Sequence, residues 1–465
     1  MTDVDLGALL AAIVGPANVA SGDAINDDDT HDEALTSVPV RPAHVVRPGS
    51  TADVAAIVAL AGEHRVPLTA RGSGTGLSGA ATPIEGGVVV AFDRMDAILE
   101  LDLENHVAVV QPGVTLHQLD EATAAVGMVY PVFPGESSAS LGGNVATNAG
   151  GMRAVKYGVT RHQVLGLEAV LGTGEVIRTG GKFVKATTGY DLTQLIVGSE
   201  GTLALVTEVI VRLYPRPAHA ATLLAPFATL EDVTGAVPRI VAGGSRPLIV
   251  EYIDLMTMAA LTASAGIDLG IPPSIKDAAL AYLVVVLEDR SDVRLDEDVQ
   301  ELASLVSELG ALDVYVLPAG AGAQLIEARE KAFWTAKAHG ANDIVDMVVP
   351  RAAIPAYMKA VSELAAATGS LIVGCGHAGD GNVHLSVFQG DEATRHDVLE
   401  SLFAAGMALG GAISGEHGIG VAKRGYYEKL EDPTKLALQR RIKAAFDPHG
   451  ILNPGKIFDP EGDSE

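Results

Sequence analysis

The sequence is poor in cysteine, in basic residues and in aromatic residues. Cys375 is the single cysteine of 465 residues, which excludes a disulfide framework within the chain and suits a reducing cytosol. The 32 lysine and arginine residues face 58 acidic residues, and the net charge is −26. This balance argues against nucleic acid and against an anionic membrane surface as partners. An aromatic content of 4% also leaves little stacking surface for bases.

Long apolar runs are missing as well. No stretch of about 18 apolar residues is free of charges and loop signals, so we expect no transmembrane segment. The start of the chain, Met1–Leu6, has no basic cluster of the kind that opens a signal peptide. We therefore expect a soluble cytoplasmic protein. With 48% hydrophobic residues in a chain of this length, two or three domains are expected.

The first half of the chain alternates short β-rich runs with helices and glycine loops. Residues 1–40 predict a short apolar helix followed by an acidic turn at Asp27, Asp28 and Asp29. Residues 41–217 form the next unit, and Tyr214-Pro-Arg-Pro217 is the best boundary. Within this unit Ser50-Thr-Ala-Asp53 is typical of a capping box that opens a helix over 51–64. Strands are predicted at 66–70, 87–92 and 106–110.

Beyond Pro217 the predicted elements follow a β-α-β-β-α-β order. This order is typical of a ferredoxin-like α+β layer. The six segments are 221–226, 229–241, 247–254, 281–288, 294–309 and 312–317.

Three stretches are rich in glycine and other small residues. Arg71–Gly79 contains the spacing G-x-G-x-x-G, but Pro83 and two further glycines leave no room for the helix that a Rossmann fingerprint must open. This loop should join two strands directly, and its N–H groups could cradle a pyrophosphate. The stretches 134–151 and 198–207 repeat the theme. One such loop is as readily a simple turn, whereas three in one domain favour a large flat cofactor.

Two histidine motifs lie in the last fifth of the chain. They read His377-Ala-Gly-Asp-Gly-Asn-Val-His384 and Ser414-Gly-Glu-His-Gly-Ile-Gly420. We expect these histidines in glycine-rich loops, with His377 and His384 brought together across the Gly-Asp-Gly turn. Imidazole and carboxylate groups bind Zn²⁺ and similar cations, and imidazole also transfers protons near neutral pH. Taken alone, the motifs are explained equally well by histidines with structural hydrogen bonds.

Seven motifs in order resemble those of a known family. They are Arg71–Gly79, Pro134–Gly151, Gly189–Leu192, Gly198–Thr202, Gly376–His384, Gly415–Gly420 and Leu452–Gly455. Across about residues 41–460 the chain is similar to the FAD-linked oxidases and dehydrogenases of the vanillyl-alcohol oxidase or p-cresol methylhydroxylase (PCMH) type. More narrowly, it resembles the D-2-hydroxyacid dehydrogenases: D-lactate and D-2-hydroxyglutarate dehydrogenase and the FAD-linked subunit of glycolate oxidase.

The resemblance implies an α+β fold with a PCMH-type FAD-binding domain and a cap domain built on an antiparallel sheet. It divides the chain into 1–40, an FAD-binding domain at 41–217, a cap with the metal site at 218–425 and a C-terminal return at 426–465. The FAD should be non-covalent, because Arg71–Gly74 contains no histidine or cysteine. The cofactor-binding residues implied are Arg71, Gly72, Ser73, Gly74, Thr75, Gly76, Ser78, Gly79, Pro134, Gly135, Ser140, Gly142, Gly143, Ala146, Thr147, Asn148, Gly150, Gly151, Gly158, Glu200, Gly201 and Asn453.

The same resemblance assigns a metal and a substrate. His377, His384 and Glu416 would bind a divalent cation, most simply Zn²⁺, with Mn²⁺ or Fe²⁺ as alternatives. Oxidation of a 2-hydroxyacid removes a hydroxyl proton and an α-carbon hydride, so a base is needed beside the flavin. His417 would be that base, and Arg329 would bind the substrate carboxylate. The electrons must then reach an acceptor, which would be a quinone, an electron-transfer protein or a partner subunit. A homodimer is also considered.

Substrate choice depends on three aligned positions. Relatives specific for hydroxyglutarate carry polar residues at these positions, which hold the distal carboxylate of the substrate. The aligned residues of this chain are Phe333, Ile344 and Ser386. Burying an unpaired second carboxylate against apolar groups is costly. We therefore expect a monocarboxylic acid such as D-lactate, glycolate or a longer 2-hydroxyacid. D-2-hydroxyglutarate dehydrogenase and the FAD subunit of a multi-protein glycolate oxidase are the alternatives, with a purely structural zinc site more distant.

Overall fold

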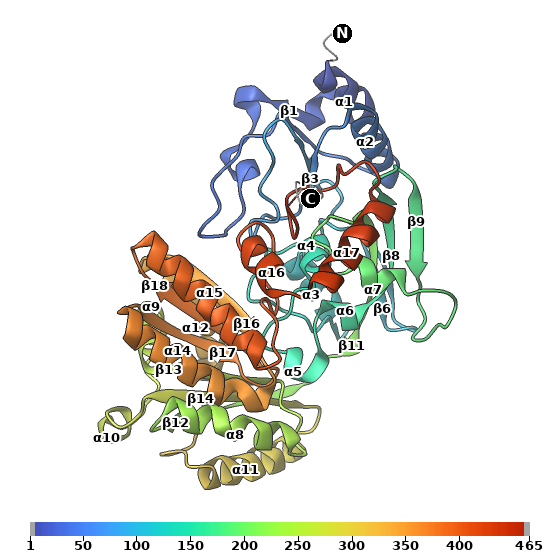
Figure 1. Ribbon diagram of the computed structural model, residues 1–465. Helices are drawn as coiled ribbons and strands as arrows, with labels where there is room; N and C mark the ends of the chain where they lie inside the picture. Colours follow the sequence, from blue (N-terminus) through green and yellow to red (C-terminus); the bar gives the residue numbers. More distant parts are fainter. Residues whose placement is uncertain (1–4, 460–465) are drawn as a thin grey trace.

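The computed structural model describes residues 5–459 (Figure 1). Its first sheet has the order β1-β2-β4-β3, in which the last three strands run parallel and β1 is an antiparallel edge. The strands are β1 (Val19–Ser21), β2 (His44–Val46), β4 (Val88–Ala91) and β3 (Leu68–Arg71). No helix separates β3 from β4, which confirms that the first glycine loop joins two strands directly. β1 was not predicted.

Helix α2 (Thr51–His64) spans the predicted residues. The Ser50 hydroxyl accepts the Asp53 N–H at 3.2 Å, whereas Asp53 Oδ2 accepts the N–H of Gly49 rather than that of Ser50, so the capping box is shifted by one residue. Its apolar face is fully buried between the first sheet and a second one, through side chains that include Ile57 and Val58.

The second sheet is antiparallel, with the order β5-β6-β10-β8-β9. In its central strand β10 buried residues largely alternate with half-buried ones, as expected for a sheet packed mainly on one face. The strands are β5 (Ile98–Asp102), β6 (Val107–Val110), β10 (Ala204–Arg212), β8 (Val164–Leu171) and β9 (Val176–Gly180).

A seven-stranded antiparallel sheet dominates the second half, with the order β15-β12-β14-β13-β17-β18-β16. Its first four strands are those of the predicted ferredoxin-like layer, which is thereby confirmed. Three strands that were not predicted extend it. The strands are β15 (Tyr315–Leu317), β12 (His219–Phe227), β14 (Ala281–Asp289), β13 (Ile249–Asp254), β17 (Leu371–His377), β18 (Asn382–Phe388) and β16 (Asp343–Val348).

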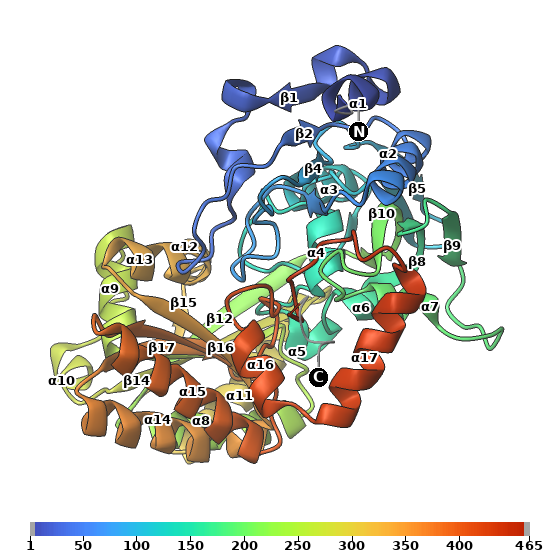
Figure 2. The same ribbon diagram turned by 45° about the horizontal axis from the view of Figure 1, so that its top comes forward.

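Helices cover this sheet on both faces (Figure 2). One face carries α8 (Leu230–Ala242), α11 (Asp292–Glu308), α14 (Ile354–Thr368) and α15 (Glu392–Ala408). The other carries α9 (Leu255–Ala265), α12 (Ala319–Glu330) and α13 (Ala332–Ala338). Helices α9 and α10 (Pro273–Lys276) form an unpredicted insertion between β13 and β14.

The end of the described chain returns to the first half. Helix α16 (Arg424–Leu430) is followed by α17 (Pro433–Phe446), which lies beside the elements of the first half of the chain in Figure 1. Lys443 Nζ donates to the Thr202 carbonyl at 2.8 Å, and the Leu68 N–H donates to the Ile451 carbonyl at 2.7 Å. The proposed boundaries at 217 and 425 stay a prediction, and the outer ends of the terminal segments, 1–4 and 460–465, lie outside the described residues.

The N-terminal segment contains the predicted helix, α1 (Leu6–Val14), and a 3-10 turn at Asp27–Thr30. Across residues 5–459, none of the helices combines the length and the apolar character needed to cross a bilayer.

Candidate functional site

His377 and His384 are held by a β-hairpin. β17 ends at His377 and β18 begins at Asn382, and the turn between them includes Gly381 with φ +96°. The expectation of loop histidines is wrong for both, because His377 is the last residue of β17 and His384 lies within β18 opposite Cys375. The expectation that the two imidazoles converge is confirmed, since their ring centroids are 4.8 Å apart. The paired strands of this hairpin therefore position both side chains.

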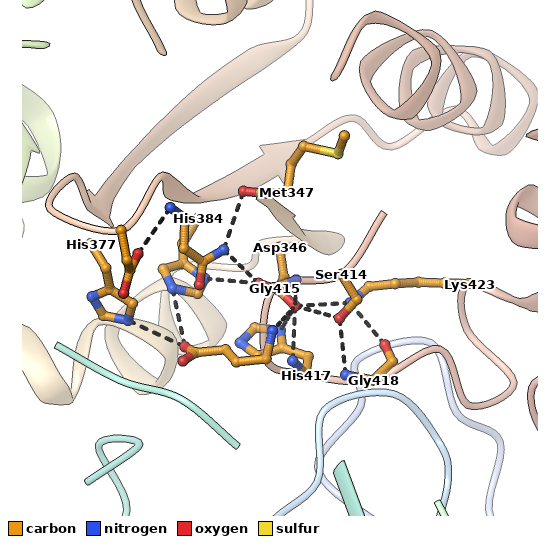
Figure 3. A network of polar contacts seen from close by, with 12 residues as sticks. Asp346, Met347, His377, His384, Ser414, Gly415, His417, Gly418 and Lys423 are labelled. Carbon is orange, nitrogen blue, oxygen red and sulfur yellow. Dashed lines mark hydrogen bonds and ion pairs between the residues drawn. The ribbon is translucent and has the colours of Figure 1, made fainter. Parts of the chain in front are cut away.

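Asp346 of β16 organises the second motif (Figure 3). Its carboxylate is fully buried, and Oδ2 accepts the Ser414 hydroxyl at 2.7 Å. The same oxygen accepts the backbone N–H groups of Gly415 at 3.1 Å, Glu416 at 3.1 Å and His417 at 2.8 Å. Burial opposes ionisation of Asp346, but the neighbouring imidazoles, Lys423 and the Ser414 hydroxyl hold its pKa well below the ordinary value. One buried charge thus shapes the loop that carries Glu416 and His417.

Glu416 lies between the two hairpin histidines. Its Oε1 is 3.2 Å from Nε2 of His377 and 3.2 Å from Nε2 of His384. One ligand atom from each of the three residues lies within 4.8 Å of the others. Two imidazole nitrogens and one carboxylate oxygen suit Zn²⁺, Mn²⁺ or Fe²⁺ and leave positions for substrate oxygens. Asp346, His384 and His417 form a second such group, but the bonds already made to Asp346 favour the first.

Glu251 of β13 connects the candidate metal site to Arg329. Its Oε1 is 2.6 Å from Nδ1 of His377, and its Oε2 is 2.7 Å from Nη2 of Arg329 at the end of α12. Burial raises the pKa of Glu251, yet Arg329 and His377 outweigh it and the pKa falls below its usual value. A carboxylate on Nδ1 directs Nε2 of His377 toward a ligand. Arg329 is itself buried, with 7% of its side chain exposed.

The proton on His417 is disfavoured. The pKa of this imidazole is lowered to about 4, chiefly by burial, with Lys423 and His384 acting in the same direction and Asp346 opposing them. The ring is therefore neutral near pH 7 and can accept a proton. Its Nδ1 lies 3.9 Å from Oδ2 of Asp346.

Two cavities meet at Glu416 and His417, which line both. The first runs along the three glycine-rich stretches. The second lies between β17, β18 and β16 on one side and α9 and α13 on the other, and Arg329, His377 and His384 line it. Phe333, Ile344 and Ser386 line this second cavity as well.

Two family models match the chain. An FAD binding domain matches residues 42–180, and the C-terminal domain of FAD linked oxidases matches residues 216–457. The chain belongs to the FAD-linked oxidases.

Relatives of known sequence extend over nearly the whole chain. An uncharacterized FAD-linked oxidoreductase of Mycobacterium tuberculosis is 58% identical, covering 98% of this chain and 99% of the relative. The glycolate oxidase subunit GlcD of Bacillus subtilis is 38% identical, covering 98% and 97%. A D-lactate dehydrogenase of Archaeoglobus fulgidus is 39% identical, covering 89% and 90%. This FAD-linked oxidase is thus an oxidoreductase of the D-2-hydroxyacid dehydrogenase branch.

The fold is also similar to that of a solved protein structure. The solved structure of p-cresol methylhydroxylase superimposes with a TM-score of 0.81 at 19% identity, covering 98% of this chain and 97% of that one. The expected PCMH-type fold is therefore confirmed.

The first cavity of this FAD-linked oxidase suits a large cofactor. A Cβ added at Gly72 would lie 1.9 Å from Ser140 Oγ, and Gly74 adopts φ +75°, so glycine is required at both. Asn144 of α4 (Leu141–Thr147) has a buried Nδ2 without a hydrogen-bond partner within the described chain, and it lines this cavity. The glycines leave room for a bound FAD against the backbone, and the Asn144 amide could donate a hydrogen bond to it.

The expected cofactor residues divide by position. Those on the wall of the first cavity are Gly72, Ser73, Gly74, Thr75, Gly76, Pro134, Gly135, Ser140, Gly143, Ala146, Thr147, Glu200 and Gly201. Gly142 lines an adjoining cavity, and Gly151 lines the second one. Residues that line none of these walls are Arg71, Ser78, Gly79, Asn148, Gly150, Gly158 and Asn453.

Some of these off-wall residues support the walls. Asn453 Nδ2 donates to the carbonyls of Ala80 at 2.9 Å and Glu200 at 2.8 Å. Gly150 packs on the candidate metal site, since a Cβ there would lie 2.6 Å from Glu416 Oε2. Arg71 donates to the His31 carbonyl at 2.6 Å. These three residues therefore contact neighbouring segments of the protein and do not face the first cavity.

Glu200 joins the two halves of the site. Its carboxylate oxygens accept the N–H groups of Ile419 and Gly420, each at 2.7 Å. Burial raises its pKa to about 7, against the pull of these donors and of Lys423. The loop after His417 is therefore tied to a wall of the first cavity.

Sequence reasoning missed Glu251, Asp346, Asn144 and Lys423. Asp346 and Glu251 each lie on a strand among apolar residues, where a buried carboxylate is unusual. That pattern is the one signal that the sequence offered. Their partners are too distant along the chain to be inferred from it.

Proposed function

We propose that this protein oxidises a monocarboxylic D-2-hydroxyacid to the 2-oxoacid, with non-covalent FAD and a divalent cation bound by His377, His384 and Glu416. The observation that carries the proposal is the meeting of two cavities at Glu416 and His417. A cofactor in the first and a substrate in the second would touch at this point. D-lactate and glycolate are the simplest candidates, in keeping with the names of the relatives.

The chemistry is divided between the bound groups and the chain. When bound, FAD provides a two-electron acceptor and the cation provides positive charge near the substrate hydroxyl. His417 removes the hydroxyl proton. Because its Nδ1 faces Asp346 at 3.9 Å, Nε2 is the proposed acceptor. The depressed pKa keeps the ring neutral and ready for this step.

Arg329 is proposed to bind the substrate carboxylate. It lines the second cavity, and Glu251 anchors the guanidinium from behind. A guanidinium has five N–H donors, so the pair with Glu251 leaves donors for a carboxylate. A lysine could not reproduce this planar fork, and Arg329→Lys should be poorly tolerated.

Phe333 and Ile344 support a monocarboxylic substrate. Both line the second cavity with Ser386, and none of the three offers a positive charge to a distal carboxylate. D-2-hydroxyglutarate is therefore the alternative substrate rather than the favoured one.

We propose a cytoplasmic enzyme that passes its electrons to a quinone, an electron-transfer protein or a partner subunit. A multi-protein complex of the glycolate oxidase type is the alternative assembly.

Purified protein tests the proposal directly. It should be yellow and should release FAD on denaturation. With an artificial electron acceptor it should oxidise D-2-hydroxyacids and leave the L-enantiomers unchanged. Chelation should lower the activity, and Zn²⁺ or Mn²⁺ should restore it. Full activity in metal-free protein would contradict the role of the metal. Flavin that stays attached after denaturation would contradict the non-covalent binding of FAD.

A further inference from the structure

We infer that the second cavity selects D-2-hydroxyacids with an extended apolar side chain, longer than the methyl group of lactate. This inference rests on the proposed function and deepens it. It follows from the order in which side chains line the cavity floor, from the charge of its walls and from its mouth.

The cavity floor is one face of the β17–β18 hairpin. Side chains two residues apart on a strand lie on the same face, and directly paired residues share it. The register pairs Cys375 with His384, Val373 with Ser386 and Leu371 with Phe388. All six line the second cavity.

The three pairs follow one another along the strands, each farther from the candidate metal site than the last. The floor begins at the histidines, passes the pair Val373 and Ser386, and reaches Leu371 and Phe388. From His384 to Phe388 the strand advances four residues, which is about 13 Å. A three-carbon acid bound at the metal end would fill only the first part of this path.

The walls beyond the metal end are mainly apolar. Met256, Ala260 and Leu261 of α9 face the cavity from one side, and Ala332 and Ala336 of α13 line it as well. Ile344 continues the floor on β16, because it is paired with Ser386. Such a wall favours methylene and methyl groups over polar ones.

The distribution of charged residues around the cavity also favours an apolar substrate side chain. Arg329 is the only lysine or arginine that the structure places on its wall, and Glu251 is already 2.7 Å from its guanidinium. His339 lies on the outer wall, where its Nδ1 is 2.8 Å from the Thr335 carbonyl. With Arg329 assigned to the α-carboxylate, a second carboxylate would find no further lysine or arginine among the described residues that line the path.

The far end of the path opens with exposed apolar side chains. Leu371 is 42% exposed and Met256 is 53% exposed, and both line the cavity. A side chain that reaches this end would cover apolar surface that water otherwise contacts. Each methylene buried should then raise kcat/KM by about threefold to fourfold until the path is filled.

A chain-length series on the FAD-loaded enzyme tests the inference. The acids are D-lactate, D-2-hydroxybutanoate, D-2-hydroxyhexanoate and D-2-hydroxyoctanoate, compared with D-2-hydroxyglutarate. We expect kcat/KM to rise along the monocarboxylic series and to be lowest for the dicarboxylate. Calorimetric binding of pyruvate and 2-oxooctanoate to the same enzyme should follow the same order, which separates affinity from turnover.

A rim variant and a matched control locate the effect. Leu371→Asp should lower the ratio of the octanoate to the lactate kcat/KM several-fold, because a charge would meet the acyl chain. Leu438→Asp replaces a leucine of similar exposure, 49%, on α17 and should leave the ratio unchanged.

The outcomes are distinguishable. If D-lactate or glycolate has the highest kcat/KM, the inference is overturned and the proposed function stands. If no 2-hydroxyacid is oxidised or bound, the proposed function fails and the inference fails with it. An equal loss of the ratio in both leucine variants would also contradict the inference.

Discussion

Oδ2 of Asp346 accepts the backbone N–H of His417 at 2.8 Å and lies 3.9 Å from its Nδ1. A fully buried carboxylate therefore stands directly behind the proposed base. The same oxygen accepts three further donors from residues 414–416. The loop cannot shift without leaving a buried charge partly unpaired, which is costly. Asp346 thus acts as a positioning residue for His417 and for Glu416.

Asp346→Asn should disturb this loop while keeping the side-chain volume. An amide nitrogen in place of Oδ2 would face N–H groups, and rotation of the amide would place it against Asn382, which donates to Oδ1 at 2.8 Å. We expect kcat to fall by about 10²-fold, with a loss of metal affinity and unchanged flavin content. Steady-state kinetics, metal analysis and visible absorbance measure these. Asp343→Asn on the same strand is the control, and an equal loss there would contradict the assignment.

The pH dependence of kcat/KM reports on His417. Its pKa is lowered to about 4 by burial, so the neutral base persists until the pH falls close to that value and is lost below it. We expect the acidic limb of the profile near pH 4 rather than near the ordinary 6.5. Metal content measured at each pH controls for metal release. A midpoint near 6.5 with full metal occupancy would contradict the lowered pKa of this imidazole.

Glu251→Gln tests the link between the metal site and Arg329. The amide removes the charge that pairs with Arg329, and its NH2 group must face either Nη2 of Arg329 or Nδ1 of His377 in place of an acceptor oxygen. We expect metal affinity to fall by about 10–100-fold and KM to rise, with FAD retained. Metal titration followed by calorimetry measures the first effect. Glu208→Gln on β10 serves as the control, and unaltered metal affinity in Glu251→Gln would rule out the link.

Gly72→Ala tests the first cavity. The added Cβ would lie 1.9 Å from Ser140 Oγ, so either the loop must move or the Ser140 hydroxyl must give up the Gly143 N–H that it accepts as the N-cap of α4. We expect the purified variant to carry little FAD. The single tryptophan, Trp334, lines this cavity, so FAD should quench its fluorescence in the wild type and much less in the variant. Gly235→Ala in α8 meets nothing within 4 Å and is the control. Normal flavin content in Gly72→Ala would contradict the placement of FAD.

Local signals made part of the fold predictable. Ser50 and the apolar spacing after it predicted α2, and Pro83 with its neighbouring glycines excluded a Rossmann helix. The ferredoxin-like order followed from six segments whose periodicity was clear. The strands β16, β17 and β18 were missed because their glycines, histidines and aspartate mask the alternation of a strand, as Gly374, Gly376 and Asp346 show.

The candidate site was predictable only where its residues are close in sequence. The spacing of His377 and His384 across a turn predicted that they converge. The contacts of Glu251 with His377 and of Glu200 with Gly420 span 126 and 220 residues, and they depend on strand order rather than on motif. The pairing of Arg329 with Glu251 was likewise out of reach.

Anaerobic reduction of the bound flavin tests the central claim most directly. Holoenzyme would be mixed with each D-2-hydroxyacid of the series and with the L-enantiomers, and the loss of visible flavin absorbance followed over time. We predict rapid bleaching by D-enantiomers, none by L-enantiomers, and a rate lowered about 10²–10⁴-fold in His417→Asn. Flavin that stays oxidised with every D-2-hydroxyacid, in protein that holds FAD and metal, would contradict the account.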